Sequence, residues 1–234
     1  GVPSTEALIM THGLEVPNSV GLFGGLPGAC VTQRLRTAGG QLEELGPKPG
    51  LIELRPGDVF ETTWQGGGGL GDALDRDPAL VAADVRTGHV SREAAQRCYG
   101  VVLDASGDAD PAAADQCRQR LRAERLQASA SVPLTTNVSH LTTHIGGRLH
   151  FGQLDGATWF ACACGCALAA READWHRGAV QAVIQPGQLG PLYRLHERLE
   201  LRQYACPACG GLLSVEVAEK GWQALPDIEL GPQS

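Results

Sequence analysis

The first 65 residues alternate short apolar runs with glycine and proline, a pattern typical of short β-strands joined by turns. The predicted strands are residues 7–10, 31–35, 51–54 and 59–62. Turns are expected where glycine or proline interrupts the apolar runs, for example at Gly24-Gly25 and Pro56-Gly57. This part of the chain is therefore expected to be mainly antiparallel sheet.

Helical patterns begin after a glycine-rich run at residues 66–71. Asp77 and Asp110 each precede a proline, and an aspartate N-cap followed by proline at the first helical position is a strong start signal. Gly88 is expected to end the first of these helices. The predicted helices are residues 78–86, 92–97 and 111–127.

The third predicted helix has an apolar face and many arginines. Ala114, Cys117 and Leu121 share one face, and arginines are expected to crowd the exposed sides. Those arginines are Arg118, Arg120, Arg122 and Arg125. Such a cluster can bind an anion or a nucleic acid, but the interleaved Glu124 favours a solvated helix face or a subunit contact.

The rest of the chain returns to strand patterns. Residues 128–138 have the composition of a linker. The predicted strands beyond them are residues 149–151, 157–161, 199–204 and 212–217, with helical segments around residues 169–177 and 192–198. Two of these strands lead directly into cysteine-rich turns.

Five of the eight cysteines gather in two short motifs about forty residues apart. The motifs are Cys162-Ala-Cys164-Gly-Cys166 and Cys206-Pro-Ala-Cys209-Gly210. Four thiolates suit a tetrahedral zinc ion and leave no open position, so the predicted zinc is structural rather than catalytic. A redox site or an iron–sulfur cluster at the five cysteines is an alternative. The predicted fold class is α+β, with a β-rich N-terminal domain and short helices followed by a C-terminal zinc-ribbon-like domain.

Composition narrows the possible functions. The chain has 234 residues, 43% hydrophobic content and a formal net charge of −7. The acidic balance argues against a generic nucleic-acid surface, which needs positive charge to neutralise phosphates. No apolar run approaches the ~18 residues of a membrane span, and the tight cysteine spacing is poor disulfide geometry. We therefore expect a protein of the reducing cytoplasm with no membrane partner.

Two further motifs have ordinary interpretations. The run of four glycines at residues 66–69 lacks the lysine and hydroxyl residue of a phosphate-binding loop, so close backbone packing or a turn is favoured. His140 and His144 have the spacing of metal ligands on a helix, but Thr142, Thr143 and the following glycines argue against a helix there. We expect surface or core roles for these histidines.

Residues 12–103 closely resemble the C-terminal end of hydantoinase B/oxoprolinase family proteins. The resemblance is carried by residues 21–28 (GLFGGLPG), the glycine run ending at Asp72, and residues 77–102 (DPALVAADVRTGHVSREAAQRCYGVV). Members of that family are the large subunits of ATP-dependent hydantoinases and of acetone and acetophenone carboxylases. The metal-binding histidines and carboxylates of those subunits lie outside the region that this chain resembles, so the resemblance implies no catalytic residue here.

Residues 145–230 resemble the small gamma subunit of acetone carboxylase. The resemblance is carried by the first cysteine motif, Trp175, residues 201–217 (LRQYACPACGGLLSVEV) and residues 225–230 (LPDIEL). By this motif the zinc ligands are expected to be Cys162, Cys164, Cys206 and Cys209. Cys166 falls where relatives often carry histidine and stays an alternative ligand.

Together the two resemblances imply a subunit of a multisubunit ATP-dependent ketone carboxylase, a ligase that forms C–C bonds. We expect a hydantoinase B C-terminal-like domain at residues 1–127, a linker at 128–144 and a gamma-like zinc-binding domain at 145–234. The chain is expected to be structural, with larger hydantoinase A-like and hydantoinase B-like partner subunits. Those partners would bind ATP, a further metal ion, the ketone and bicarbonate. The alternatives are a subunit of an ATP-dependent hydrolase of cyclic amides and a free-standing zinc-ribbon binding module.

Overall fold

The computed structural model describes residues 3–127, 136–223 and 228. The N-terminal part forms an arm of five short strands. They are β1 (Thr5–Ile9), β2 (Thr32–Arg36), β3 (Leu42–Glu44), β4 (Gly50–Leu54) and β5 (Val59–Thr63). The four strands predicted in this region are confirmed, and β3 was missed because it has only three residues, two of them glutamates.

All strand pairs of the arm are antiparallel, as expected. β1 pairs with β4, and β2 lies between β3 and β5 in a second small sheet. The predicted turn between β4 and β5 is present, with Gly57 at φ 92°. Nevertheless β4 and β5 belong to different sheets, so this turn separates two sheets instead of closing a hairpin.

The glycine-rich runs pack backbone against backbone, which confirms the interpretation of residues 66–69 as a close-packing segment. Leu22 N donates to Gly69 O at 2.9 Å, and Gly69 N donates to Leu26 O at 2.8 Å. A Cβ atom built on Gly25 would lie 2.0 Å from Gly69 O, and one on Gly68 would lie 1.8 Å from Val20 O. Only glycine permits this approach of the two segments.

The predicted helices form with the expected starts. η1 (Ala73–Asp75) leads into α1 (Pro78–Arg86), α2 (Arg92–Tyr99) and α3 (Pro111–Gln127). Asp77 Oδ1 accepts a hydrogen bond from Ala79 N at 2.8 Å, and Ser91 Oγ accepts one from Ala94 N at 3.1 Å. Val81, Ala95 and Val101 form a small buried core where α1 and α2 meet.

The C-terminal part contains two antiparallel sheets. The first runs in the order β6 (His140–Gly146), β7 (Leu149–Leu154), β8 (Ala157–Cys162), β9 (Ala167–Ala170). The second runs in the order β10 (Val180–Ile184), β11 (Leu199–Ala205), β12 (Leu212–Glu219). The short element η2 (Trp175–Gly178) connects the two sheets, and α4 (Pro186–Leu189) lies between β10 and β11. Among the described residues the fold is thus sheet-rich with few helices, in agreement with an α+β class.

The helical segments predicted at residues 169–177 and 192–198 are wrong. The first begins inside β9, where Ala169 pairs with Phe160, and only a short 3₁₀ turn forms near its end. In the second, the backbone bonds to distant loops: Cys30 N donates to Leu192 O, and His196 N donates to Glu15 O. Tertiary partners have overridden local helix propensity in both places.

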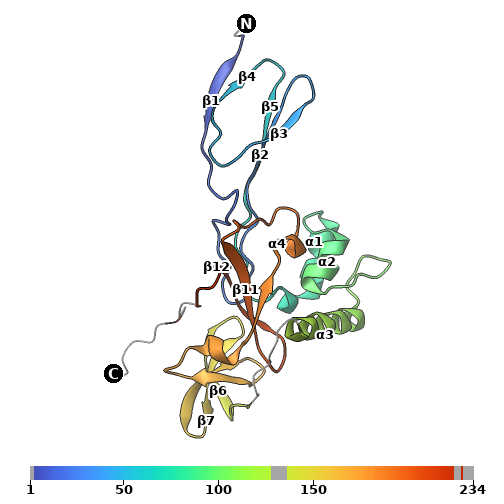
Figure 1. Ribbon diagram of the computed structural model, residues 1–234. Helices are drawn as coiled ribbons and strands as arrows, with labels where there is room; N and C mark the ends of the chain where they lie inside the picture. The colour runs from blue at the N-terminus through green and yellow to red at the C-terminus, as the bar shows by residue number, and fades with distance from the viewer. Residues whose placement is uncertain (1–2, 128–135, 224–227, 229–234) are drawn as a thin grey trace.

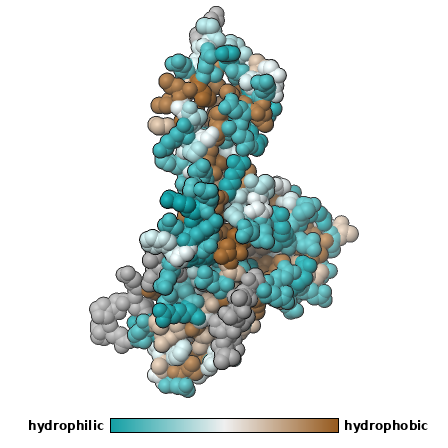
Figure 2. Space-filling view, viewed as in Figure 1, coloured by the Kyte–Doolittle hydropathy of each residue, from teal (hydrophilic) through white to brown (hydrophobic). Residues whose placement is uncertain are grey.

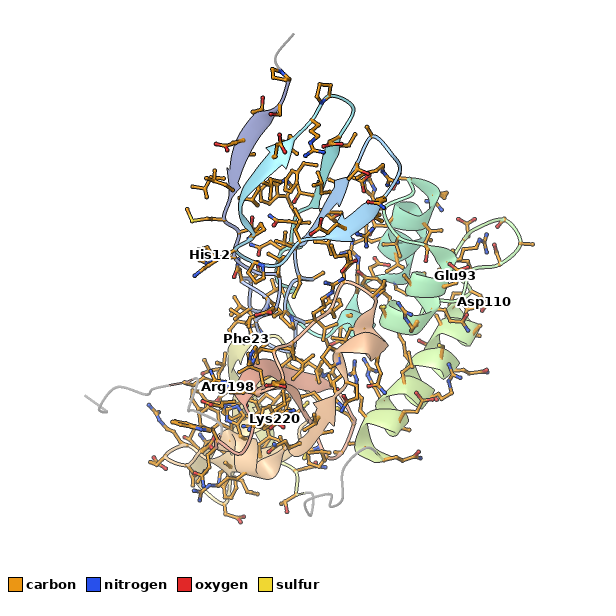
Figure 3. All side chains as sticks on the ribbon, turned by 45° about the horizontal axis from the view of Figure 1, so that its top comes forward. His12, Phe23, Glu93, Asp110, Arg198 and Lys220 are labelled. Carbon is orange, nitrogen blue, oxygen red and sulfur yellow. The ribbon has the colours of Figure 1, made fainter. Side chains whose placement is uncertain are left out.

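Figure 1 shows the arm at one end of the molecule, β11 and β12 beside the helices in the middle, and the β6–β7 hairpin at the other end. Phe23, labelled in Figure 3, joins the glycine-rich segment to that hairpin, since a Cβ on Gly146 would meet its ring at 2.3 Å. Of the predicted linker, residues 128–135 lie outside the described part of the chain, and β6 begins at His140. None of the helices described is long and apolar enough to cross a bilayer.

Candidate metal centre

The first cysteine motif forms a tight turn at the end of β8. Gly165 N donates to Cys162 O at 2.8 Å, and Cys162 N donates to Cys166 O at 2.8 Å. Gly165 adopts φ 92°, a conformation that favours glycine. The turn therefore brings the side chains of Cys162 and Cys164 to the same side of the backbone, toward the second motif.

The second motif repeats this arrangement between β11 and β12. Gly210 N donates to Cys206 O at 2.9 Å, and Cys206 N donates to Gly211 O at 2.8 Å. Gly210 has φ 66°, so here too glycine permits the backbone to turn sharply after the last cysteine. Each motif is held by its own backbone hydrogen bonds and by the strands that flank it.

The two turns bring four sulfur atoms together. The Sγ atoms of Cys162 and Cys209 are 3.8 Å apart, and those of Cys164 and Cys206 are 3.6 Å apart. All four lie within 4.8 Å of one another. Four sulfurs around a tetrahedral ion at a bond length of about 2.3 Å would be about 3.8 Å apart. These four cysteines are therefore positioned to bind a metal ion.

Cys166 lies beside this group and not in it. Its side chain is fully buried, and its Sγ donates to Ala167 O at 3.5 Å. Burial also raises the pKa of its thiol. The group of four sulfurs contains the exposed Cys164 in its place.

Hydrogen bonds among the four sulfur groups separate their pKa values. The pKa of Cys164 falls to about 6, mainly through hydrogen bonds from Cys162 and Cys206. The pKa of Cys206 is raised, first through its hydrogen bond with Cys162. Four thiols so close together do not all ionise unless a cation compensates their charge. The guanidinium of Arg148, 3.8 Å from Cys209 Sγ, supplies one positive charge at the edge of the group.

An aromatic core supports the cysteine turns from behind. Cys162 and Cys206 belong to the same buried cluster as Trp175 and Tyr204. The rings of Trp175 and His176 stack with centroids 3.9 Å apart, and Asp174 fixes His176 through a 2.7 Å bond to Nδ1. Trp175, which the sequence pattern singled out, is thus part of the hydrophobic core that holds both motifs in place.

A buried carboxylate ties the second motif to the helical part of the chain. Asp72 has no exposed side-chain surface and forms a two-pronged ion pair with Arg125 at 2.7 and 2.9 Å. Its other hydrogen bonds come from Leu74 N at 3.0 Å and Leu212 N at 2.9 Å. Arg125 also donates to Gly210 O at 3.2 Å, immediately after Cys209. The position of the second motif therefore depends on residues far away in sequence.

The arginines of α3 are less exposed than the sequence predicts. The side chains of Arg122 and Arg125 are only 23% and 17% exposed. Arg122 binds Asp75 at 2.6 Å, and Arg148 binds the same carboxylate at 2.6 Å. These two arginines of α3 therefore contact other parts of the same chain, and the prediction of a solvated or intersubunit face is wrong for them.

The histidine motif lies on a strand, which confirms that it is not helical. β6 contains a register irregularity between Leu141 and Thr143, so His140 pairs with Gln153 while His144 pairs with His150. The rings of His144 and His150 are 4.9 Å apart between centroids. The structure thus separates the two histidines of the sequence motif and places a different one beside His144.

Comparison with known families agrees with both resemblances. Residues 136–232 match the family model described as acetone carboxylase gamma subunit, so the C-terminal part of the chain carries a domain of that kind. Within the matched range, residues 224–227 and 229–232 lie outside the described part, while Ile228 packs against the core cluster that contains the cysteines.

Two curated proteins share sequence with the chain. Caprolactamase subunit beta of Pseudomonas jessenii is 48% identical over 63 residues, which are 27% of this chain and 11% of that protein. Acetone carboxylase alpha subunit of Xanthobacter autotrophicus is 37% identical over 79 residues, which are 32% of this chain and 10% of that protein. The chain therefore spans about a tenth of the length of these relatives.

A solved structure of ATP-dependent caprolactamase from Pseudomonas jessenii also matches, with a TM-score of 0.41 and 32% identity. The match covers 49% of this chain and 20% of that one. By name, the two curated relatives are subunits, one of a caprolactamase and the other of an acetone carboxylase.

Proposed function

We propose that the chain is a structural and assembly subunit of a multisubunit ATP-dependent ketone carboxylase of the acetone or acetophenone type. One observation carries the proposal: a single chain joins a gamma-type domain at residues 136–232 to sequence similar to an acetone carboxylase alpha subunit. Covalent linkage of segments similar to two subunits of one enzyme is the arrangement expected of a part that holds such subunits together. Catalysis resides mainly on the partner subunits, and no catalytic residue is assigned to this chain.

The four clustered cysteines are proposed to bind one structural zinc ion in a zinc-ribbon-like domain. The all-sulfur donor set and the spacings of 3.6 and 3.8 Å support this assignment, because zinc prefers tetrahedral thiolate ligands in closed sites. Four protein ligands leave no position for a substrate. The zinc would cross-link the turn after β8 to the turn after β11 and so stabilise both sheets of the C-terminal part.

The proposal includes a division of labour within the chain and with its partners. Residues 1–127 would form the hydantoinase B-like domain and residues 145–234 the zinc-binding domain. Residues 128–144 would link them, although from His140 onward they already belong to β6. Larger hydantoinase A-like and B-like subunits would bind ATP, a further metal ion, the ketone and bicarbonate. Cytoplasmic conditions suit this assignment because they keep thiolate ligands reduced.

A second candidate is a subunit of an ATP-dependent hydrolase that opens cyclic amides. The 48% identity to caprolactamase subunit beta over 63 residues favours it, whereas the gamma-type domain favours the carboxylase. Both enzymes consume ATP, so ATP hydrolysis alone does not separate them.

The test is an assay of the complex purified from source cells through a tag on this chain. ATP consumption that requires both bicarbonate and a ketone, with a carboxylated product, is the result expected for the carboxylase. ATP consumption that requires a lactam or hydantoin and no bicarbonate would replace it by the hydrolase. A chain that purifies without any larger subunit would contradict both.

A further inference from the structure

Among the strands of the arm, only β2 contributes buried side chains, which are those of Thr32, Gln33 and Leu35. The hydrophobic core clusters found among the described residues include no residue of these five strands. In β1 and β4, every residue is either half-buried or exposed. A two-stranded sheet is marginal in water unless another surface covers one of its faces. The β1–β4 sheet therefore needs a covering surface that the described residues do not provide.

The outer face of the β1–β4 sheet is apolar where such a surface would lie. Leu8 and Leu51 are directly opposite each other in the register and are 61% and 65% exposed. Met10, two residues beyond Leu8, is 70% exposed. Figure 2 shows hydrophobic side chains on the exposed surface of this end of the molecule. We call Glu6, Leu8, Met10, Leu51 and Glu53 the Leu8 face.

The charges of this face indicate what covers it. Glu6 and Glu53 are opposite each other on the two strands, and like charges at such a pair of positions repel. Arg55 binds Glu53 at 2.9 Å, but among the described residues no ion pair involves Glu6. A surface that combines apolar groups with a lysine or arginine would cover the leucines and pair with Glu6.

We propose that the Leu8 face docks onto the larger subunit of the complex, at an apolar surface flanked by a basic side chain. This inference rests on the proposed function. A second copy of this chain fits less well, because it would bring the same two glutamates and no free basic group on that face. In the two relatives, the matching segment is about a tenth of a much longer chain. A large subunit of that length is the partner onto which the arm would dock.

The experiment compares variants of the tagged full-length chain expressed in source cells. Leu8→Glu and Leu51→Glu place charge in the centre of the face, and Glu6→Lys reverses the charge at its edge. Leu80→Glu is the matched control, because Leu80 is 55% exposed on α1, away from the arm. Native mass spectrometry measures how much large subunit is recovered with each chain, and circular dichroism and zinc content verify that each variant is folded.

We expect at least tenfold less large subunit with Leu8→Glu and Leu51→Glu, less also with Glu6→Lys, and wild-type recovery with Leu80→Glu. Wild-type recovery with folded Leu8→Glu and Leu51→Glu would overturn the docking proposal and leave the proposed function standing. A wild-type chain that recovers no large subunit would refute the proposed function itself. A wild-type homodimer that Leu8→Glu converts to a monomer would assign the face to a second copy and also overturn the proposal.

Discussion

Replacing Asp72 with asparagine tests how the metal centre is held against the helical part of the chain. The change keeps the shape of the side chain but removes the charge that faces Arg125, whose side chain is only 17% exposed. In the variant, the amide NH₂ faces hydrogen-bond donors that bind a carboxylate oxygen in the wild type. Removing one partner of a buried ion pair costs about 3–5 kcal/mol.

We expect Asp72→Asn to lower the free energy of unfolding by about 3 kcal/mol, the lower end of this range. The reason is that Arg125 is partly exposed and keeps its hydrogen bond to Gly210 O. Such a loss is a large part of the ~5–15 kcal/mol by which domains are usually stable. The assay is urea unfolding of the metal-loaded protein, followed by circular dichroism. The midpoint should fall by roughly 1 M with an unchanged slope.

The control is Asp108→Asn, because Asp108 is 71% exposed and pairs with Arg86 at 3.0 Å on the surface. Asp108→Asn should lower the free energy of unfolding by less than about 1 kcal/mol. Equal, small losses for Asp72→Asn and Asp108→Asn would refute the reasoning.

Three further outcomes are expected. Burial raises the pKa of Asp72, but Arg125 and the hydrogen bonds from Leu212 N and Leu74 N together lower it to below its ordinary value. The resulting stability is present above the unfolded pKa of about 3.9 and is lost as pH falls through the folded value. The free energies of unfolding of wild type and Asp72→Asn, measured at decreasing pH, should therefore converge below about pH 4. A difference between the two that stays constant at low pH would contradict this. Cys209→Ser should abolish stoichiometric zinc, measured by elemental analysis, whereas Cys98→Ser should retain it; equal zinc contents would contradict the ligand set. Gly25→Ala should lower stability by about 1–3 kcal/mol through overpacking against Gly69 O, while Gly67→Ala, which meets no atom within 4 Å, should change thermal unfolding little.

The sequence predicted those features that depend on neighbouring residues. The starts of α1 and α3 follow from an aspartate before a proline, and both cysteine turns follow from cysteine–glycine spacing. In each case the interacting atoms lie within a few positions of one another, so a short motif contains the necessary information.

Features that depend on distant partners were missed. β10 was not predicted, and it is a strand because it pairs with β11 about twenty residues later. Nothing near Asp72 indicates that its carboxylate binds Arg125, 53 positions away, or Leu212 N, 140 positions away. The same holds for Arg122 and Arg148, which share Asp75. These contacts arise only after the two parts of the chain pack together.

Native mass spectrometry of the assembly isolated from source cells through this chain tests the central claim most directly. The account predicts that the chain is found in a complex with larger hydantoinase-type subunits and carries one zinc ion per copy. A 24.6 kDa species that migrates alone, with or without zinc, would contradict its role as an assembly subunit.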